Sequence, residues 1–160
     1  VKMAEALARH YNADVTLARR AAYLHDITKE MPYDEQIKLI DKSDMRLTGI
    51  QRSKKIIHAF SGAIVAKEEF GESDEVCDAI RWHTTAKAGM TLLSKIIWLS
   101  DLTEEGRAFP GVSEIRELAF RDLGRALILG FDTTLSFLSE KGELYRKIFH
   151  FFKNGTCNFT

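Results

Sequence analysis

A histidine followed directly by an aspartate, His25-Asp26, is the pair best suited to bind a metal ion. The pair ends a run of small and apolar residues, and Lys29 follows it closely. Burying an unpaired carboxylate beside an imidazole costs several kcal/mol, so a core helix carrying both needs a cation or hydrogen-bond partners for them. A metal ion is the most specific candidate. The dipeptide alone is weak evidence, because such pairs also arise by chance.

Three further residues of ligand type, His58, His83 and Asp101, are spread along the chain. His58 falls at the start of one predicted helix, His83 at the end of another, and Asp101 inside a third that is apolar almost all round. For each histidine alone, a structural imidazole is a competing interpretation. For Asp101 the alternative is a structural hydrogen bond. Helices converging on one centre would explain all three together with His25-Asp26.

Imidazole and carboxylate ligands suit iron, manganese or zinc, and the absence of usable thiolates argues against a structural zinc site. Lys29 lies four residues after His25 and three after Asp26, so it projects on their side if the helix persists. Arg107 stands in a turn-rich loop directly after the helix of Asp101. If Asp26 bridges two ions, a metal-activated water can attack phosphorus while the two cations neutralise phosphate oxygens. The alternative for Lys29 is a solvated helix end.

Apolar residues recur at helical spacing along the chain, and no alternating strand pattern competes, so the sequence predicts an all-α fold. Asp14, Ser73 and Thr91 are expected N-caps, while Asn12 and Gly71 are expected helix terminators. The polar stretch 41–55 is either a mobile loop at the mouth of a site or a charged, solvated connector. The expected helices cover about residues 1–11, 15–25, 33–40, 58–70, 74–83, 92–105, 112–120, 123–138 and 143–152.

The composition is that of a single domain over residues 1–160, with 45% hydrophobic and 29% charged residues. Lysine plus arginine and aspartate plus glutamate balance at 23 each, so no global charge favours a nucleic-acid polymer or an acidic membrane. Cys77 and Cys157 lack metal-ligand spacing and are interpreted as reduced thiols. No run approaches the roughly 18 apolar residues of a membrane span, and no signal peptide is recognised. A cytoplasmic location is expected.

The ordered series of histidines and aspartates resembles the metal-binding signature of HD-domain phosphohydrolases. The likeness extends to AAYLHDITK, HAFSGA, AIRWHTTAKAGMTLLSKIIWLSD and GRAFPGV, which resemble the bacterial YqeK-type symmetrical diadenosine tetraphosphatases. It runs in register from residue 1 to about residue 152. The resemblance implies an all-α HD-domain helical bundle with a metal site between helices. It also implies hydrolysis of diadenosine tetraphosphate to two ADP.

The same resemblance implies the cofactor and the roles of the residues. Iron is the expected metal, as one or two ions, with manganese or another divalent transition metal as the alternative. His25, Asp26 and Asp101 would ligate one ion, and His58 and His83 would serve a second metal or the substrate. Lys29, Thr84 and Arg107 are expected substrate contacts, with Asp26 and Lys29 as the catalytic pair. The implied partners are dinucleoside tetraphosphate and ADP or GDP, with a homodimer possible.

The family carries a further ligand histidine in its first helix, which by register falls just upstream of Val1. His10 aligns elsewhere and does not replace it. We therefore expect that the first helix of this sequence is truncated at its N-terminus, or that its site lacks one ligand.

Two other functions compete. Another HD phosphohydrolase would act on cyclic nucleotides, deoxynucleoside triphosphates or guanosine polyphosphate alarmones, although the Arg107 loop and the segment HTTAKAGMT favour the tetraphosphatase. A non-catalytic nucleotide-sensing domain would keep the fold without turnover. Metal analysis combined with phosphate release from a nucleotide panel separates these functions.

Overall fold

Helices alone, with no strand, form the regular structure of residues 1–49 and 51–140, the part of the chain that the computed structural model describes. The expected all-α class is confirmed. The helix expected over residues 143–152 lies outside the described residues. The helices are α1 (Lys2–His10), α2 (Val15–Leu24), α3 (Tyr33–Lys42), α4 (Ile57–Glu68), α5 (Asp74–Trp82), α6 (Leu92–Leu102), α7 (Val112–Ala119) and α8 (Leu123–Glu140).

The helix ends carry the signals expected from the sequence. The Asp14 side chain accepts two main-chain N–H groups from the first turn of α2, at 2.7 and 3.0 Å. Ser73 accepts one from α5 at 3.3 Å, and Thr91 one from α6 at 3.1 Å. These bonds satisfy N–H groups that have no partner within the helix. Asn12 and Gly71, which follow α1 and α4, adopt the left-handed backbone that ends a helix, with φ of 52° and 63°.

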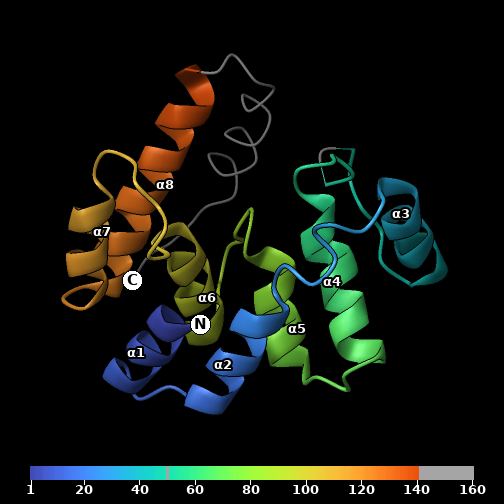
Figure 1. Ribbon diagram of the computed structural model, residues 1–160, viewed down its shortest axis with the longest axis horizontal. Helices are drawn as coiled ribbons and strands as arrows, with labels where there is room; N and C mark the ends of the chain where they lie inside the picture. Colours follow the sequence, from blue (N-terminus) through green and yellow to red (C-terminus); the bar gives the residue numbers. More distant parts are fainter. Residues whose placement is uncertain (50, 141–160) are drawn as a thin grey trace. The chain divides into compact units, whose positions relative to one another are not determined.

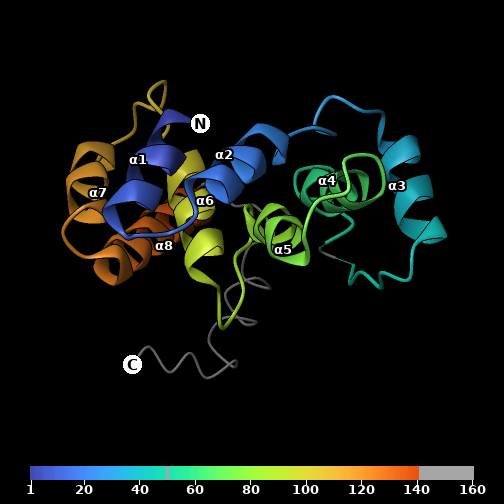
Figure 2. The same ribbon diagram turned by 90° about the horizontal axis from the view of Figure 1, so that it is seen from below.

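The chain divides into two compact units, Val1–Asp101 and Leu102–Thr160. In the first unit α2 packs against α1 and α5, α5 against α4, and α4 against α3 (Figures 1 and 2). In the second unit α7 packs against α8. The assignment of residues 1–160 to a single HD domain stays a prediction.

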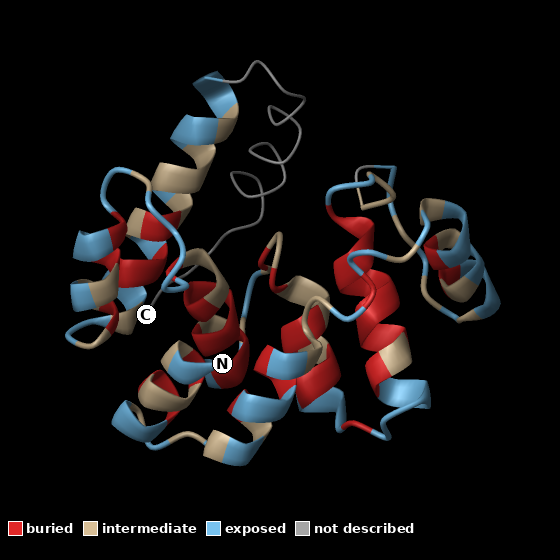
Figure 3. Cartoon of the chain, in the orientation of Figure 1, coloured by how far each residue is buried: buried red, intermediate tan, exposed pale blue. Residues whose placement is uncertain are grey.

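Helix α4 packs against both α5 and α3 and is buried on nearly every side (Figure 3). Residues 56–64 are all buried, because the sequence there carries small and apolar side chains without a polar face. Such a helix must be surrounded by others. As a result, its first turn brings His58 into the interior, where the side chain is 8% exposed.

The polar connector between α3 and α4 is tied to the start of α3. The Tyr33 hydroxyl donates to the Arg52 carbonyl at 2.8 Å, and the Lys54 ammonium lies 5.8 Å from the centre of the Tyr33 ring. Arg52 also pairs with Asp41 at 2.8 Å. That the stretch 41–55 is a mobile loop at the mouth of a site stays a prediction.

Candidate metal centre

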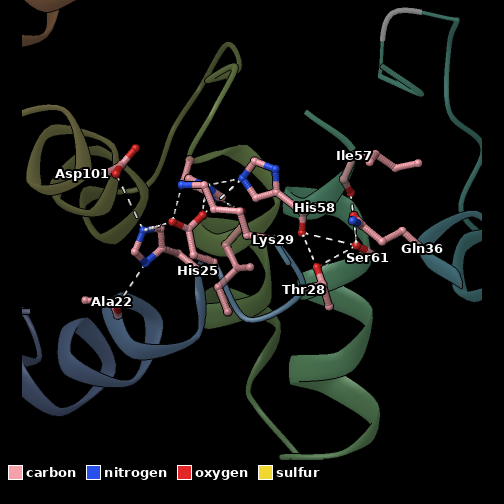
Figure 4. Close-up of polar contacts among 12 residues, drawn as sticks. Ala22, His25, Thr28, Lys29, Gln36, Ile57, His58, Ser61 and Asp101 are labelled. Carbon is pink, nitrogen blue, oxygen red and sulfur yellow. Dashed lines mark hydrogen bonds and ion pairs between the residues drawn. The ribbon is translucent and has the colours of Figure 1, made fainter. Parts of the chain in front are cut away.

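The first unit brings together the five ligand-type residues that the sequence singled out. His25 and Asp26 follow α2, His58 is the second residue of α4, His83 directly follows α5, and Asp101 is the next-to-last residue of α6. Figure 4 shows that His25 and Lys29, from the segment after α2, lie near His58 of α4, with Asp101 beside His25. Four helices therefore contribute to one cluster, as the sequence analysis proposed.

Helix α2 ends before this cluster, at Leu24. Successive turns replace it, because the N–H groups of residues 27, 29 and 31 donate to carbonyls three residues earlier at 2.9–3.1 Å. The helix therefore ends before Lys29, whereas the sequence prediction had assumed that it continues to this residue. The turns still place the Lys29 ammonium on the side of the cluster, 2.7 Å from Asp26 Oδ2.

Asp26 is the centre of the cluster, and its two carboxylate oxygens face different partners. Oδ1 lies 3.2 Å from His58 Nε2 and 3.5 Å from His83 Nε2. Oδ2 lies 2.7 Å from the Lys29 ammonium and 3.4 Å from His25 Nε2. One carboxylate therefore contacts three imidazoles and a cation.

Two of the imidazoles are oriented by the helix that precedes them. His25 Nδ1 donates to the Ala22 carbonyl at 3.0 Å, and His83 Nδ1 donates to the Ile80 carbonyl at 2.7 Å. A carbonyl oxygen only accepts hydrogen bonds, so Nδ1 carries the hydrogen in both rings. In the neutral rings Nε2 then holds a lone pair that points into the cluster, which is the state in which histidine binds metal.

This geometry places electron-rich atoms opposite one another. His58 Nε2 lies 3.3 Å from His83 Nε2 and 3.2 Å from Asp26 Oδ1, and the one hydrogen that this nitrogen can carry serves only one of those two atoms. The lone pair of His83 Nε2 and Asp26 Oδ1, 3.5 Å apart, therefore still face each other as acceptors. Two acceptors that face each other repel unless a cation lies between them. The Lys29 ammonium is not that cation, because it contacts the other carboxylate oxygen, Asp26 Oδ2. His25, Asp26 and His83 each offer one ligand atom, and these atoms lie within 4.8 Å of one another. The nitrogen and oxygen donor set fits a divalent metal ion.

The charge states of the cluster favour metal binding. Burial raises the pKa of Asp26, but the His58 imidazole and the Lys29 ammonium beside the carboxylate outweigh burial and hold that pKa well below its usual range. Burial lowers the pKa of His83, which keeps the ring neutral. Burial also opposes the charged form of His25, yet Asp101 and Asp26 outweigh it and raise the pKa of His25. The cluster therefore offers a divalent metal ion an ionised carboxylate and a neutral imidazole, and a metal bound at His25 would compete with a proton for that ring.

Asp101 lies at the edge of the cluster. Its Oδ1 is 3.7 Å from His25 Nε2, and its side chain is 23% exposed. The sequence suggested a carboxylate enclosed by the apolar surface of α6. The structure corrects this, because Asp101 stands at the end of α6, beyond the fully buried Ile96 and Leu99.

Two expected substrate contacts have different surroundings. The Thr84 hydroxyl, next to His83, is buried and lacks a hydrogen-bond partner within the described part of the chain. Arg107 belongs to the second unit, where Arg116 donates to the main-chain carbonyls of residues 103, 104 and 107 at 2.6–2.9 Å. The assignment of both residues to substrate stays a prediction.

Three buried polar residues next to the cluster, Thr28, Gln36 and Ser61, were not predicted from the sequence. They hydrogen-bond to one another and to the carbonyl of His58. None of them is a metal-ligand type, so no motif drew attention to them. The available signal was a serine in the apolar run of α4, because a buried hydroxyl needs a partner.

Several known proteins are similar to this chain. The family model for the HD domain matches residues 1–124. A symmetrical bis(5'-nucleosyl)-tetraphosphatase of Bacillus subtilis is 41% identical over 86% of this chain and 74% of its own length. A protein with the same description in Halalkalibacterium halodurans is 38% identical over the same shares. A solved structure from Clostridium acetobutylicum, an HD superfamily hydrolase described as involved in NAD metabolism, superposes with a TM-score of 0.85. It is 37% identical, and the match covers 89% of this chain and 77% of that one.

Proposed function

Because this chain belongs to the HD-domain family and, within it, to the symmetrical bis(5'-nucleosyl)-tetraphosphatases, we propose that it hydrolyses dinucleoside tetraphosphates. Diadenosine tetraphosphate is the proposed substrate, and two ADP molecules are the products. The observation that carries the proposal is the set of facing acceptors around Asp26, which calls for a cation. This cluster lies within residues 1–124, the range that matches the HD-domain family.

The HD domain implies a divalent metal, and His25, Asp26 and His83 form its candidate site. We propose iron as that metal, with manganese as the alternative, and we propose that His58 and Asp101 complete the ligand set. A metal ion bound there supplies Lewis acidity toward phosphate oxygens and activates water for attack on phosphorus. The chain itself supplies the anionic Asp26 and orients two imidazoles by their Nδ1 hydrogen bonds.

Lys29 is the proposed phosphate-binding group of the centre. Its ammonium carries three donors, of which the contact to Asp26 uses one, and its side chain is 49% exposed. It can therefore bind a phosphate oxygen while it stays paired with the carboxylate. The Thr84 hydroxyl, which lacks a hydrogen-bond partner among the described residues, is a second proposed donor, and Arg107 is a third. These donors would neutralise charge that develops on the phosphate in the transition state.

The proposed reaction breaks the central P–O–P bridge of the tetraphosphate. Water adds its oxygen to one of the two inner phosphorus atoms, the bond from that phosphorus to the bridging oxygen breaks, and one ADP leaves. Symmetrical cleavage requires that the protein hold a nucleoside with two phosphates on the side under attack. A protein that holds a single phosphate there would release AMP and ATP.

Product chromatography tests the proposal. Protein loaded with Fe²⁺ or Mn²⁺ should convert diadenosine tetraphosphate to ADP alone. The variant His25→Asn should lose this activity, whereas His10→Asn, a matched change at an exposed histidine outside the cluster, should keep it. Equal amounts of AMP and ATP would contradict symmetrical cleavage.

The same assay separates the competing functions. Phosphate release from cyclic nucleotides, deoxynucleoside triphosphates or guanosine polyphosphates, with diadenosine tetraphosphate untouched, would favour another HD phosphohydrolase. Binding of nucleotides by metal-loaded protein without any product would favour the sensing domain.

A homodimer and the choice between adenine and guanine stay predictions, to be measured by size-exclusion chromatography and by comparing diadenosine with diguanosine tetraphosphate. None of the helices among the described residues is long and apolar enough to span a membrane.

A further inference from the structure

We propose that Thr28, Ser61 and Gln36 form a positioning network for the metal centre, and that α3 thereby supports catalysis although none of its residues belongs to the centre. The inference rests on the proposed function, because it assigns these side chains a role in the same reaction. They are positioning residues, since they act through His58 and the turn that carries Lys29.

The three side chains form a continuous chain of hydrogen bonds between α4, α3 and the turn after Asp26 (Figure 4). Thr28 Oγ1 lies 2.9 Å from the His58 carbonyl and 2.8 Å from Ser61 Oγ. Ser61 Oγ lies 3.0 Å from Gln36 Oε1. Gln36 Nε2 donates to the Met31 carbonyl at 2.8 Å. All four contacts are within hydrogen-bonding distance.

The hydrogen atoms available fix the direction of these bonds. Because Gln36 Nε2 donates to a carbonyl, its Oε1 faces Ser61 and is the nearest acceptor of the single hydroxyl hydrogen of that serine. The carbonyls of Ile57 and His58 are more distant acceptors of the same hydrogen, at 3.3 and 3.4 Å. Ser61 Oγ can then only accept from Thr28, which shares its own hydrogen between Ser61 and the His58 carbonyl. The Met31 N–H donates to the Thr28 carbonyl at 3.0 Å, which closes the network into a ring. Lys29 lies in the main-chain segment from Thr28 to Met31, which is part of that ring.

Burial makes the ring sensitive to any loss. Thr28 is 1% exposed, Ser61 0% and Gln36 4%. Solvent therefore cannot replace a missing partner, and a lost hydroxyl leaves buried polar atoms unpaired unless the main chain moves. Helix α4 approaches the turn closely here, since a Cβ atom on Gly62 would lie 3.5 Å from Thr28 Oγ1 and 3.6 Å from the His25 carbonyl. A shift of the turn therefore also displaces the centre.

His58 depends on this ring more than the other imidazoles do. His25 and His83 are each held at Nδ1 by a carbonyl of the preceding helix. For His58 the described residues provide no such bond at Nδ1. Its ring contacts His83 Nε2 through Nε2 at 3.3 Å, and its main-chain carbonyl accepts the bond from Thr28 across a separation of 30 residues. Removing the Thr28 hydroxyl should thus misplace His58 and Lys29 together.

The test compares variants that change the hydroxyl with one that loosens packing. Thr28→Val removes the hydroxyl at nearly constant shape, and Thr28→Ser restores it. Ile40→Val is the control, because this fully buried residue lies on α3 without a place in the ring. Titration calorimetry measures Co²⁺ binding, and urea denaturation measures folding. Kinetics with diadenosine tetraphosphate as the substrate give kcat and KM.

We expect Thr28→Val to weaken Co²⁺ binding and to lower kcat, each by about 10- to 100-fold, as changes behind metal ligands do, with KM within about 3-fold. Thr28→Ser should recover both to within about 3-fold. Ile40→Val should keep both although its urea midpoint also falls. Co²⁺ affinity and kcat of Thr28→Val within about 2-fold of the wild type would overturn the inference, and so would equal losses in Ile40→Val.

A second variant keeps the test decisive if Thr28→Val does not fold. Gln36→Met removes the polar end of the network at similar length, and we expect a loss of about 3-fold or more in Co²⁺ affinity and kcat. If Thr28→Val folds, its double variant with Gln36→Met should lose less than the product of the single losses, because both changes break one ring. The network would be refuted if the losses of the two single variants multiplied in the double variant, or if Gln36→Met left Co²⁺ affinity and kcat unchanged. Co²⁺ binding needs no substrate, so a wild type that binds metal without cleaving the tetraphosphate would refute the proposed function alone.

Discussion

Replacing Asp26 by asparagine tests the interpretation of the cluster, because it should affect metal binding and folding differently. The amide can turn its nitrogen toward His83 Nε2, which lies 3.5 Å from Asp26 Oδ1, so that a donor meets an acceptor. One such bond contributes about 1 kcal/mol. The ion pair with Lys29 is lost, and since both side chains are partly exposed this costs about 0.3 to 1 kcal/mol. The free energy of unfolding without metal should therefore change by less than about 1 kcal/mol.

Metal binding should respond far more strongly to Asp26→Asn. Two unit charges about 4 Å apart interact by about 4 kcal/mol at the effective dielectric constant of a protein surface, and a divalent ion loses at least that when the carboxylate becomes neutral. This corresponds to about a thousandfold in affinity, at about 1.4 kcal/mol for each factor of ten. Co²⁺ at about 100 times the wild-type Kd should stabilise the wild type by about 2.7 kcal/mol and the variant by less than about 0.1 kcal/mol.

Urea denaturation with Co²⁺ or with EDTA measures both quantities in one experiment. A variant that Co²⁺ still stabilises by more than about 1.5 kcal/mol would show that Asp26 is not a principal ligand. A fall of more than about 3 kcal/mol in EDTA would show that the carboxylate is satisfied without metal, and it would refute the argument from facing acceptors. His10→Asn, outside the cluster, should match the wild type in both conditions.

Three other results are expected. Lys29→Ala should retain metal but lose about 10- to 1000-fold in turnover, whereas Lys67→Ala, which also removes a lysine paired with an aspartate, should turn over normally; equal kinetics would exclude a role for Lys29. Arg107→Ala should likewise keep metal and lose turnover, and normal turnover would remove it from the site. Burial raises the pKa of Cys77, so in a Cys157→Ser background this thiol should resist Ellman's reagent at pH 8 until urea unfolds the protein. The Cys77 thiol has a lower pKa in the unfolded chain than in the folded protein. The stability that the buried thiol contributes is therefore present below about pH 8.5 and declines above it.

Local sequence patterns sufficed for the helices and for the chain positions of the ligand candidates. Asp14 and Ser73 cap the helices that the sequence assigned to them, since a capping bond spans only two or three residues. His25-Asp26 could be singled out because the two side chains are chemically distinctive and adjacent. These features depend on neighbours in the sequence, which a single chain displays directly.

The contacts that complete the site depend on residues far apart, and here the sequence was less informative. Thr28 meets Ser61 across 33 residues, and neither side chain is unusual for its helix or turn. Lys29 reaches Asp26 through turns, whereas the spacing argument assumed a helix. Asp101 is more exposed than the apolar pattern of α6 implied, because the pattern does not reveal where the neighbouring elements stop covering that helix.

The orientation of His25 and His83 by carbonyls three residues earlier also has a consequence for the order in which the centre assembles. These two rings are set within one turn of chain, whereas His58 is held by contacts that span 25 and 30 residues. Contacts between distant parts of a chain form only after the loop between them closes, and local opening removes them first. We therefore expect the amides around the start of α4 to exchange hydrogen with solvent sooner than those at the end of α5. In that case the centre would lose His58 while His83 is still aimed at the metal position.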